Sequence, residues 1–235
     1  MVKHVALVED DEVIRANYAD LLKQAGFAVS TYSSRAAAQD GFAEALPDVA
    51  LIDIALGDER DAGFELCAEL RRRSATLPIV FLTSHDADVD RISALRLGAD
   101  DYLTKDVSIG YVVVRIETLL RRLAAISSAA SGQLSAAQVD SSPTPLAIDN
   151  AVSRVHWKGR PVDLTLTQFW MLRELVRRTG GVVSHSALMA AAQIVVEQNT
   201  VTAHVKAIRD AFRRIDPAFD GIRTERGRGY RWIGP

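Results

Sequence analysis

The first half of this chain alternates short, fully apolar runs with longer segments whose apolar residues recur at helical spacing. Three of the runs have the length of a strand and no polar interruption, at 5–8, 49–52 and 79–82. An uninterrupted run indicates a strand that is covered on both faces, as in a parallel sheet. The segments with helical spacing are 12–25, 34–45, 62–73, 87–97 and 107–123. The alternation predicts a parallel sheet with helices packed on it.

Two further short strands complete the predicted sheet. Gly26 and Gly98 each suit the left-handed position that ends a helix, and short strands follow them at 27–31 and 101–104. Five strand–helix units predict an α/β doubly wound, flavodoxin-like domain with five parallel strands. In such a sheet, ligands bind outside the carboxyl ends of the strands.

Charged side chains fall at those strand ends. Glu9, Asp10 and Asp11 follow the first apolar run, Asp53 follows the second, and Lys105 follows the last short strand. Carboxylates gathered this closely call for a cation, and Mg²⁺ prefers oxygen ligands. The sequence therefore predicts an acidic metal site beside a lysine.

The two halves of the chain carry opposite charge. Residues 1–125 hold 14 basic and 21 acidic side chains, a balance of −7, whereas residues 126–235 hold 14 and 9, a balance of +5. The length of 235 residues suits two domains, and their charges indicate different tasks or, more simply, two solubilising surfaces.

No apolar run approaches the roughly 20 residues of a membrane span, so we expect a cytoplasmic protein without a membrane partner. The single cysteine, Cys67, is expected to be buried.

The serine- and alanine-rich stretch at 126–145 predicts a flexible linker between a domain at 1–125 and a second domain at 146–235. We expect the second domain to hold a small antiparallel sheet, three helices and a final hairpin at 222–232. A capping box at 165–168 opens its first helix. Its third helix, from Asn199 to about Ile215, carries an apolar stripe and, about 100° away, a polar and basic stripe. Without further evidence, such a stripe is as often a solvent-exposed helix face as it is a DNA-binding surface. The second stripe consists of Thr202, Lys206, Arg209 and Arg213.

Residues 1–123 resemble the receiver domain of bacterial response regulators. The resemblance rests on the acidic turn at 8–11, on Asp53, on Thr83 after its strand, and on the segment from Asp101 to Lys105. It implies that Asp53 accepts a phosphoryl group from a sensor histidine kinase with help from Thr83 and Lys105. It also implies that Thr83 and Tyr102 form a switch. The implied Mg²⁺ ligands are Glu9, Asp10, Asp53 and the backbone carbonyl of Ala55.

The chain departs from the receiver pattern in two places. The loop at 53–63 is about two residues longer than the usual family loop and lacks its proline, and Asp106 stands where the family has proline after Lys105. We expect a trans peptide there, because a cis bond before a residue other than proline costs about 2.5–4 kcal/mol. These two features also resemble regulators associated with a proteobacterial dedicated sortase system. His85, two residues after Thr83, is either a loop residue or a group that reaches the phosphoryl edge.

Residues 146–233 resemble the winged-helix DNA-binding domain of the OmpR/PhoB class, on the segment 200–205 and the hairpin ending Gly227-Arg228-Gly229-Tyr230-Arg231. The resemblance implies a third helix in the major groove and Arg228 in the minor groove of double-stranded promoter DNA. His204 and Arg226 are expected at phosphates, and Asn199 stands where the family usually has arginine. The candidate DNA contacts are Asn199, Thr202, His204, Lys206, Arg209, Arg213, Arg226 and Arg228.

The same resemblance implies a homodimer that forms on phosphorylation and places two winged helices on tandem half-sites, with RNA polymerase as a further partner. Its interface would pair the charges of Arg91, Asp100, Asp101, Arg115, Glu117 and Arg122. Two other classes stay open. A small phosphatase using Asp53 as a nucleophile would need a second acid–base carboxylate and a substrate cap, which the sequence lacks. An adaptor with a degenerate receiver predicts no phosphate uptake. We expect a transcription regulator that is not an enzyme.

Overall fold

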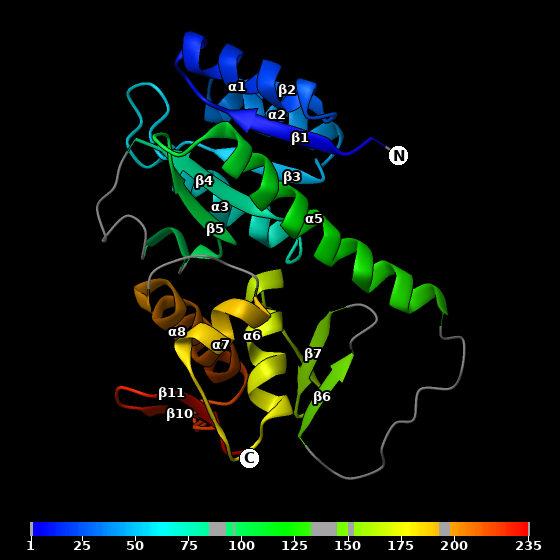
Figure 1. Ribbon diagram of the computed structural model, residues 1–235, viewed down its shortest axis with the longest axis vertical. Coiled ribbons are helices and arrows are strands. Elements are labelled where there is room, and N and C mark those ends of the chain that lie inside the picture. The colour runs from blue at the N-terminus through cyan, green and yellow to red at the C-terminus, as the bar shows by residue number, and fades with distance from the viewer. Residues whose placement is uncertain are drawn as a thin grey trace. The chain divides into compact units, whose positions relative to one another are not determined.

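The computed structural model describes residues 2–84, 93–95, 97–132, 145–149, 153–192 and 198–234. The chain divides into two units, Met1–Leu120 and Arg121–Pro235, and each is considered by itself (Figure 1). In the part of the chain that is described, no helix is long and apolar enough to cross a membrane.

The first unit contains the predicted five-stranded parallel sheet. Its strands lie in the order β2-β1-β3-β4-β5, and every neighbouring pair is parallel. The apolar runs form the three central strands, which are buried almost throughout, so the doubly wound fold is confirmed. The strands are β1 (His4–Val8), β2 (Ala28–Tyr32), β3 (Val49–Ile52), β4 (Ile79–Thr83) and β5 (Asp101–Thr104).

Helices cover both faces of this sheet. α1 (Glu12–Gln24) and α5 (Ile109–Gly132) share one apolar core with alternate residues of the strands. α2 (Arg35–Glu44) and α3 (Ala62–Arg73) lie on the other face, where the ring of Phe64 meets that of Phe81 at 5.4 Å. The carboxylate of Asp11 caps α1 by accepting the amide of Ile14 at 2.9 Å. The expected helix at 87–97 falls largely outside the described residues, as does His85.

α5 is longer than the sequence pattern predicts. The expected end was residue 123, but the helix continues to Gly132, so the first part of the expected flexible linker is helical. No glycine or proline interrupts the sequence between Gly110 and Gly132, and the alanines of this stretch favour a helix. The remainder of the expected linker, 133–144, lies outside the described residues.

The second unit has the architecture of a winged helix. An antiparallel sheet of β6 (Leu146–Asp149), β7 (Arg154–Trp157) and β8 (Arg160–Val162) precedes α6 (Leu166–Arg177). The predicted capping box opens α6, with Thr165 and Gln168 bonding reciprocally. α7 (His185–Ala191) begins after its cap Ser184, and α8 (Gln198–Ile215) is the expected third helix.

The hairpin at the end of the chain is part of a second sheet. β10 (Ile222–Glu225) and β11 (Gly229–Trp232) pair in antiparallel register, and β9 (Val182–Val183), which the sequence pattern did not predict, pairs with β11. A β-carbon at Gly229 would lie 2.0 Å from the carbonyl oxygen of Val183. This glycine therefore permits the close approach of the third strand. Beneath the hairpin, the rings of Trp157, Phe212, Phe219 and Trp232 form one aromatic cluster.

Candidate phosphoryl-acceptor and DNA-binding sites

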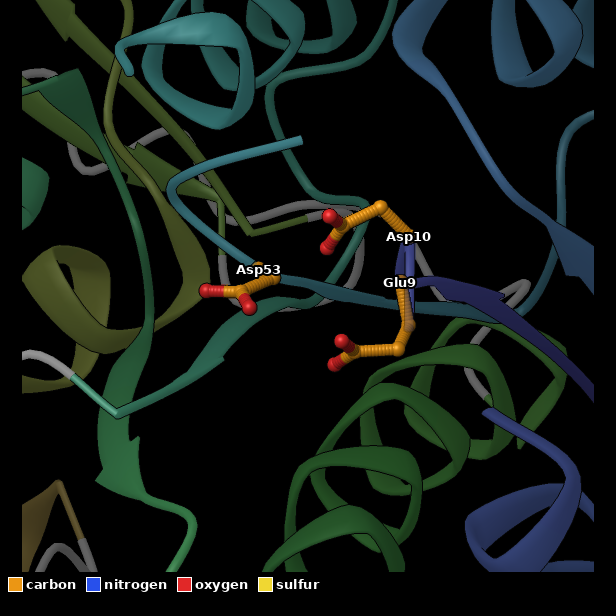
Figure 2. A group of neighbouring side chains, drawn as sticks. All are labelled: Glu9, Asp10 and Asp53. Carbon is orange, nitrogen blue, oxygen red and sulfur yellow. The ribbon is translucent and has the colours of Figure 1, made fainter. Parts of the chain in front are cut away.

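The predicted acidic site is present at the ends of β1 and β3. Carboxylate oxygens of Glu9, Asp10 and Asp53 lie within 4.8 Å of one another, and Figure 2 shows the three side chains gathered around one space. Glu9 and Asp53 are buried, whereas Asp10 is exposed. Mg²⁺ takes oxygen ligands and retains several waters, so a cluster with one open, exposed member fits that ion. The backbone carbonyl of Ala55 stays a predicted ligand.

Lys105 joins the two buried carboxylates. Its Nζ lies 2.6 Å from Glu9 Oε2 and 2.6 Å from Asp53 Oδ2. Burial alone lowers the pKa of Lys105, but the bonds to Asp53 and Glu9 outweigh that effect and raise it. Burial also raises the pKa of Glu9, although Lys105 opposes the rise. The site thus holds a charged ammonium between two carboxylates.

The acidic turn is fixed by bonds from residues that follow it. The guanidinium of Arg15 donates through Nη1 to the carbonyl oxygens of Glu9, at 2.7 Å, and Asp10, at 2.8 Å. The amide of Asp11 donates to Glu9 Oε1 at 3.3 Å. Across the site, the amide of Ile54 donates to Asp53 Oδ1 at 2.6 Å. Each oxygen of Asp53 therefore accepts a bond, Oδ1 from the Ile54 amide and Oδ2 from the Lys105 ammonium.

The longer loop after Asp53 folds into a tight turn. Backbone bonds of 3.1 and 3.4 Å join Leu56 and Glu59, and the amide of Gly57 donates to Asp10 Oδ2 at 3.1 Å. Arg35 on α2 contacts the Glu59 carboxylate at 2.9 Å and also contacts Glu65 on α3. The extra residues thus form a structure that touches the acidic site.

The predicted switch residues are both buried. Thr83 has no exposed surface at the end of β4, and the Tyr102 side chain on β5 is 6% exposed with its ring 6.5 Å from that of Phe81. Tyr102 is therefore in a covered position in this structure, and its movement stays a prediction. The peptide between Lys105 and Asp106 is trans, as expected, since the described residues contain no cis peptide bond.

α8 and the hairpin present most of the predicted DNA contacts to solvent. Thr202, Lys206 and Arg213 are exposed on α8, and Arg226 and Arg228 are exposed in the turn between β10 and β11. The hydroxyl of Tyr230 donates to Thr202 Oγ1 at 3.1 Å and so links the hairpin to the helix. The side chain of Asn199 lies outside the described residues.

Of the other predicted DNA contacts, His204 is buried and Arg209 is half-buried. His204 is fully buried, so the expected phosphate contact is not available to it here. Its position follows from helical geometry, since it lies on the turn that also buries Val201 and Val205. Arg209 donates from Nε and Nη2 to the Ile222 carbonyl, at 3.1 and 2.9 Å, and its burial lowers its pKa.

The chain matches two family models. The response regulator receiver domain matches residues 5–117, and the C-terminal domain of transcriptional regulatory proteins matches residues 159–232. The transcriptional regulatory protein CreB of Escherichia coli K12 is 34% identical over 98% of this chain and 97% of its own length. The chain belongs to the OmpR/PhoB class of two-component response regulators. Other members of this class are similar over their whole length.

The phosphate regulon transcriptional regulatory protein PhoB of Rhizobium meliloti is 34% identical over 98% of each chain. The solved structure of a RitR mutant covers 99% of this chain and all of its own, with a TM-score of 0.76 at 20% identity, which shows a shared fold. The DNA-binding winged helix expected of an OmpR/PhoB regulator is therefore confirmed as this chain's second domain.

Several charges predicted at an OmpR/PhoB dimer interface are used within the protomer. Arg115 Nε lies 2.5 Å from Asp101 Oδ2, and both side chains are at least 96% buried. Asp100 is likewise buried, and it accepts a bond from Arg71 Nη2 at 2.6 Å. Asp100, Asp101 and Arg115 are therefore bonded within the protomer, and their part in a dimer interface stays a prediction. Glu117 is exposed, whereas the side chains of Arg91 and Arg122 lie outside the described residues.

Arg15 and Gly57 support the acidic site of this OmpR/PhoB regulator and were not predicted from the sequence. Arg15 was not among the candidate site residues, although it stands four residues after Asp11 and therefore one turn into α1. Gly57 was included only as part of the longer loop at 53–63. The glycine itself was the available signal in the sequence, because glycine readily takes a positive φ. Its φ of 66° forms the turn that brings its amide to Asp10.

Proposed function

We propose that phosphorylation of Asp53 controls DNA binding by this regulator. The observation that carries the proposal is the convergence of Asp53, at 2.6 Å from the Lys105 ammonium, with the oxygens of Glu9 and Asp10. An aspartate held beside a lysine and a divalent-ion site is equipped to receive a phosphoryl group.

The reaction needs little from the protein beyond position and charge. Glu9, Asp10, Asp53 and the Ala55 carbonyl would hold Mg²⁺, which would supply positive charge to the phosphoryl oxygens. A carboxylate oxygen of Asp53 forms a bond to phosphorus as the bond from phosphorus to the imidazole of the kinase histidine breaks, and the imidazole leaves with the electron pair. Lys105 stabilises the charge on the transferred group, and its raised pKa keeps it protonated.

The phosphoryl group then changes the contacts of the switch residues. The Thr83 hydroxyl donates to a phosphoryl oxygen, and the packing around Tyr102 on β5 changes with it. Receivers in the changed state form a homodimer that places two winged helices on tandem promoter half-sites, where RNA polymerase is the further partner. Linking the two modules raises occupancy through effective concentration.

A labelling experiment tests the acceptor. Wild-type protein incubated with radiolabelled acetyl phosphate and Mg²⁺ should take up label, and Asp53→Ala should not. Asp58→Ala, which removes an exposed carboxylate from the same loop, should label as the wild type does. Label in the Asp53→Ala protein would contradict the acceptor assignment, and no label in the wild type would favour an adaptor with an inactive receiver.

A salt titration tests the DNA-binding surface. Lys206 and Arg228 are exposed on α8 and in the hairpin turn. Each alanine variant should weaken promoter binding, and loss of one phosphate contact should reduce the slope of log K against log salt by about 1. Arg154→Ala changes an exposed arginine on β7 and serves as the control. Unchanged affinity and slope in both Lys206→Ala and Arg228→Ala would remove this surface from the proposal.

A further inference from the structure

Asp10 is the one exposed carboxylate of the acidic site, and it is held by groups outside that site. The Arg15 guanidinium bonds to its carbonyl oxygen at 2.8 Å and to that of Glu9 at 2.7 Å through the same nitrogen. The amide of Gly57 bonds to its carboxylate oxygen at 3.1 Å. Main chain and side chain of Asp10 are therefore fixed from two directions.

The turn that carries the Gly57 amide is anchored at several points. Leu56 is 4% exposed and pairs with Glu59 through two backbone bonds. Gly63 donates its amide to the Ile54 carbonyl at 2.9 Å and closes the loop behind the turn. Because the buried Leu56 and the backbone bonds hold this loop in place, the Gly57 amide has a fixed position.

We propose that Arg15 and the turn at Gly57 are positioning elements for Asp10, which set the affinity of the acidic site for its divalent ion. The inference rests on the proposed function. Groups that orient metal ligands commonly change metal affinity by 10–100-fold when they are removed. On this proposal, the longer loop of this regulator helps to position Asp10 in the metal site.

The charge of Arg15 alone predicts the opposite effect. A guanidinium beside three carboxylates repels a divalent cation, so its removal would tighten metal binding if electrostatics were the whole contribution. If Arg15 acts by holding the two carbonyls, its removal loosens Glu9 and Asp10 and weakens binding. The sign of the change in affinity therefore separates the two roles.

The experiment measures dissociation constants of the full-length protein for Mg²⁺ by calorimetry and for Mn²⁺ by the electron paramagnetic resonance of the free ion. Arg15→Ala should raise the dissociation constant about tenfold. Lys23→Ala, which removes a positive charge from the other end of α1, should leave it within twofold. An unchanged or lower constant in Arg15→Ala would overturn the role of Arg15.

Gly57→Ala tests the turn without removing a charge. Gly57 has a φ of 66° and open space around it, so a methyl group strains only the backbone. The strain should shift the amide from Asp10 and raise the dissociation constant about threefold. Gly26→Ala, at a φ of 92° and also in open space at the end of α1, is the matched control. Equal constants for Gly57→Ala and wild type would exclude the turn from the proposal.

Phosphorylation kinetics distinguish positioning from damage to the fold. In Arg15→Ala, the Mg²⁺ concentration for half-maximal labelling by acetyl phosphate should rise about tenfold, while the labelling rate at saturating Mg²⁺ stays near that of the wild type. A lower rate at every Mg²⁺ concentration would contradict the inference. A wild-type protein that binds neither ion would instead refute the proposed metal site, so the two failures are distinguishable.

Discussion

Gly63 should tolerate no larger side chain, because the backbone of Asp53, the proposed phosphoryl acceptor, lies against it. A β-carbon at this position would stand 2.1 Å from the carbonyl oxygen of Asp53 and 2.8 Å from the α-carbon of Ile54. Real β-carbons essentially never approach closer than 3.0 Å, so the Asp53 carbonyl and Gly63 would have to separate by at least 0.9 Å. The atoms in the way belong to the main chain and cannot rotate aside.

The cost of Gly63→Ala follows from three contributions. Overpacking against the main chain costs about 2 kcal/mol, and stretching the bond from the Gly63 amide to the Ile54 carbonyl costs about 1 kcal/mol more. Alanine returns about 1 kcal/mol through its higher helix propensity, since Gly63 lies in the first turn of α3. The net loss is about 2 kcal/mol, which for a unit of this size lowers the melting temperature by about 8 °C.

Calorimetry measures this loss and Gly110→Ala provides the comparison. Gly110 is also the second residue of a helix, α5, but a β-carbon there would meet nothing within 4 Å. Its alanine variant should melt at the wild-type temperature or above. Equal melting temperatures for Gly63→Ala and wild type would refute the argument from backbone contact, as would equal losses in both variants.

Three further outcomes are expected. Arg209→Ala should destabilise the winged helix by about 1–2 kcal/mol in urea followed by tryptophan fluorescence, because its bonds to β10 are lost; Lys206→Ala, on the exposed side of α8, should change stability by less than about 0.5 kcal/mol. The Cys67 thiol is buried with a pKa of about 12, so a thiol reagent at pH 8 should label it only in denaturant. Burial alone raises the pKa of Asp48, but bonds from the His4 amide and the Lys3 ammonium lower it overall from 3.8. The stability that the Asp48 carboxylate contributes is present above pH 3.8 and is lost as the pH falls through its lowered pKa. Between about pH 4 and 2, the free energy of unfolding of Asp48→Asn should therefore fall less than that of the wild type, by under about 1 kcal/mol.

The sequence predicted well those positions that stand next to a regular apolar pattern or within a short local motif. Continuous apolar runs located the central strands, and residues directly after a parallel strand must meet at one edge of the sheet. For that reason the sequence alone predicted that Asp10, Asp53 and Lys105 lie close together. The capping box at Thr165 was likewise contained within four residues.

The sequence pattern failed where a residue's partner is far along the chain. The basic stripe on α8 gave Arg209 the same rank as Lys206, yet only Arg209 has a carbonyl of β10 within reach. His204 was assigned to a phosphate by the family resemblance, although its helical position beside Val201 and Val205 buries it. Asp101 and Arg115 were predicted among the interface charges, and their bond within one protomer was not foreseen, because charge and spacing do not say which copy supplies a partner.

The ties between α8 and the hairpin have a consequence for the proposed recognition of promoter DNA. Arg209 reaches the carbonyl of Ile222 and the hydroxyl of Thr224, while Tyr230 bonds to Thr202, so helix and hairpin move as one body. A protein whose two reading elements are already aligned loses little conformational entropy on binding. It also accepts little variation in the distance between neighbouring grooves, so the local width of the DNA contributes to the choice of site alongside the bases.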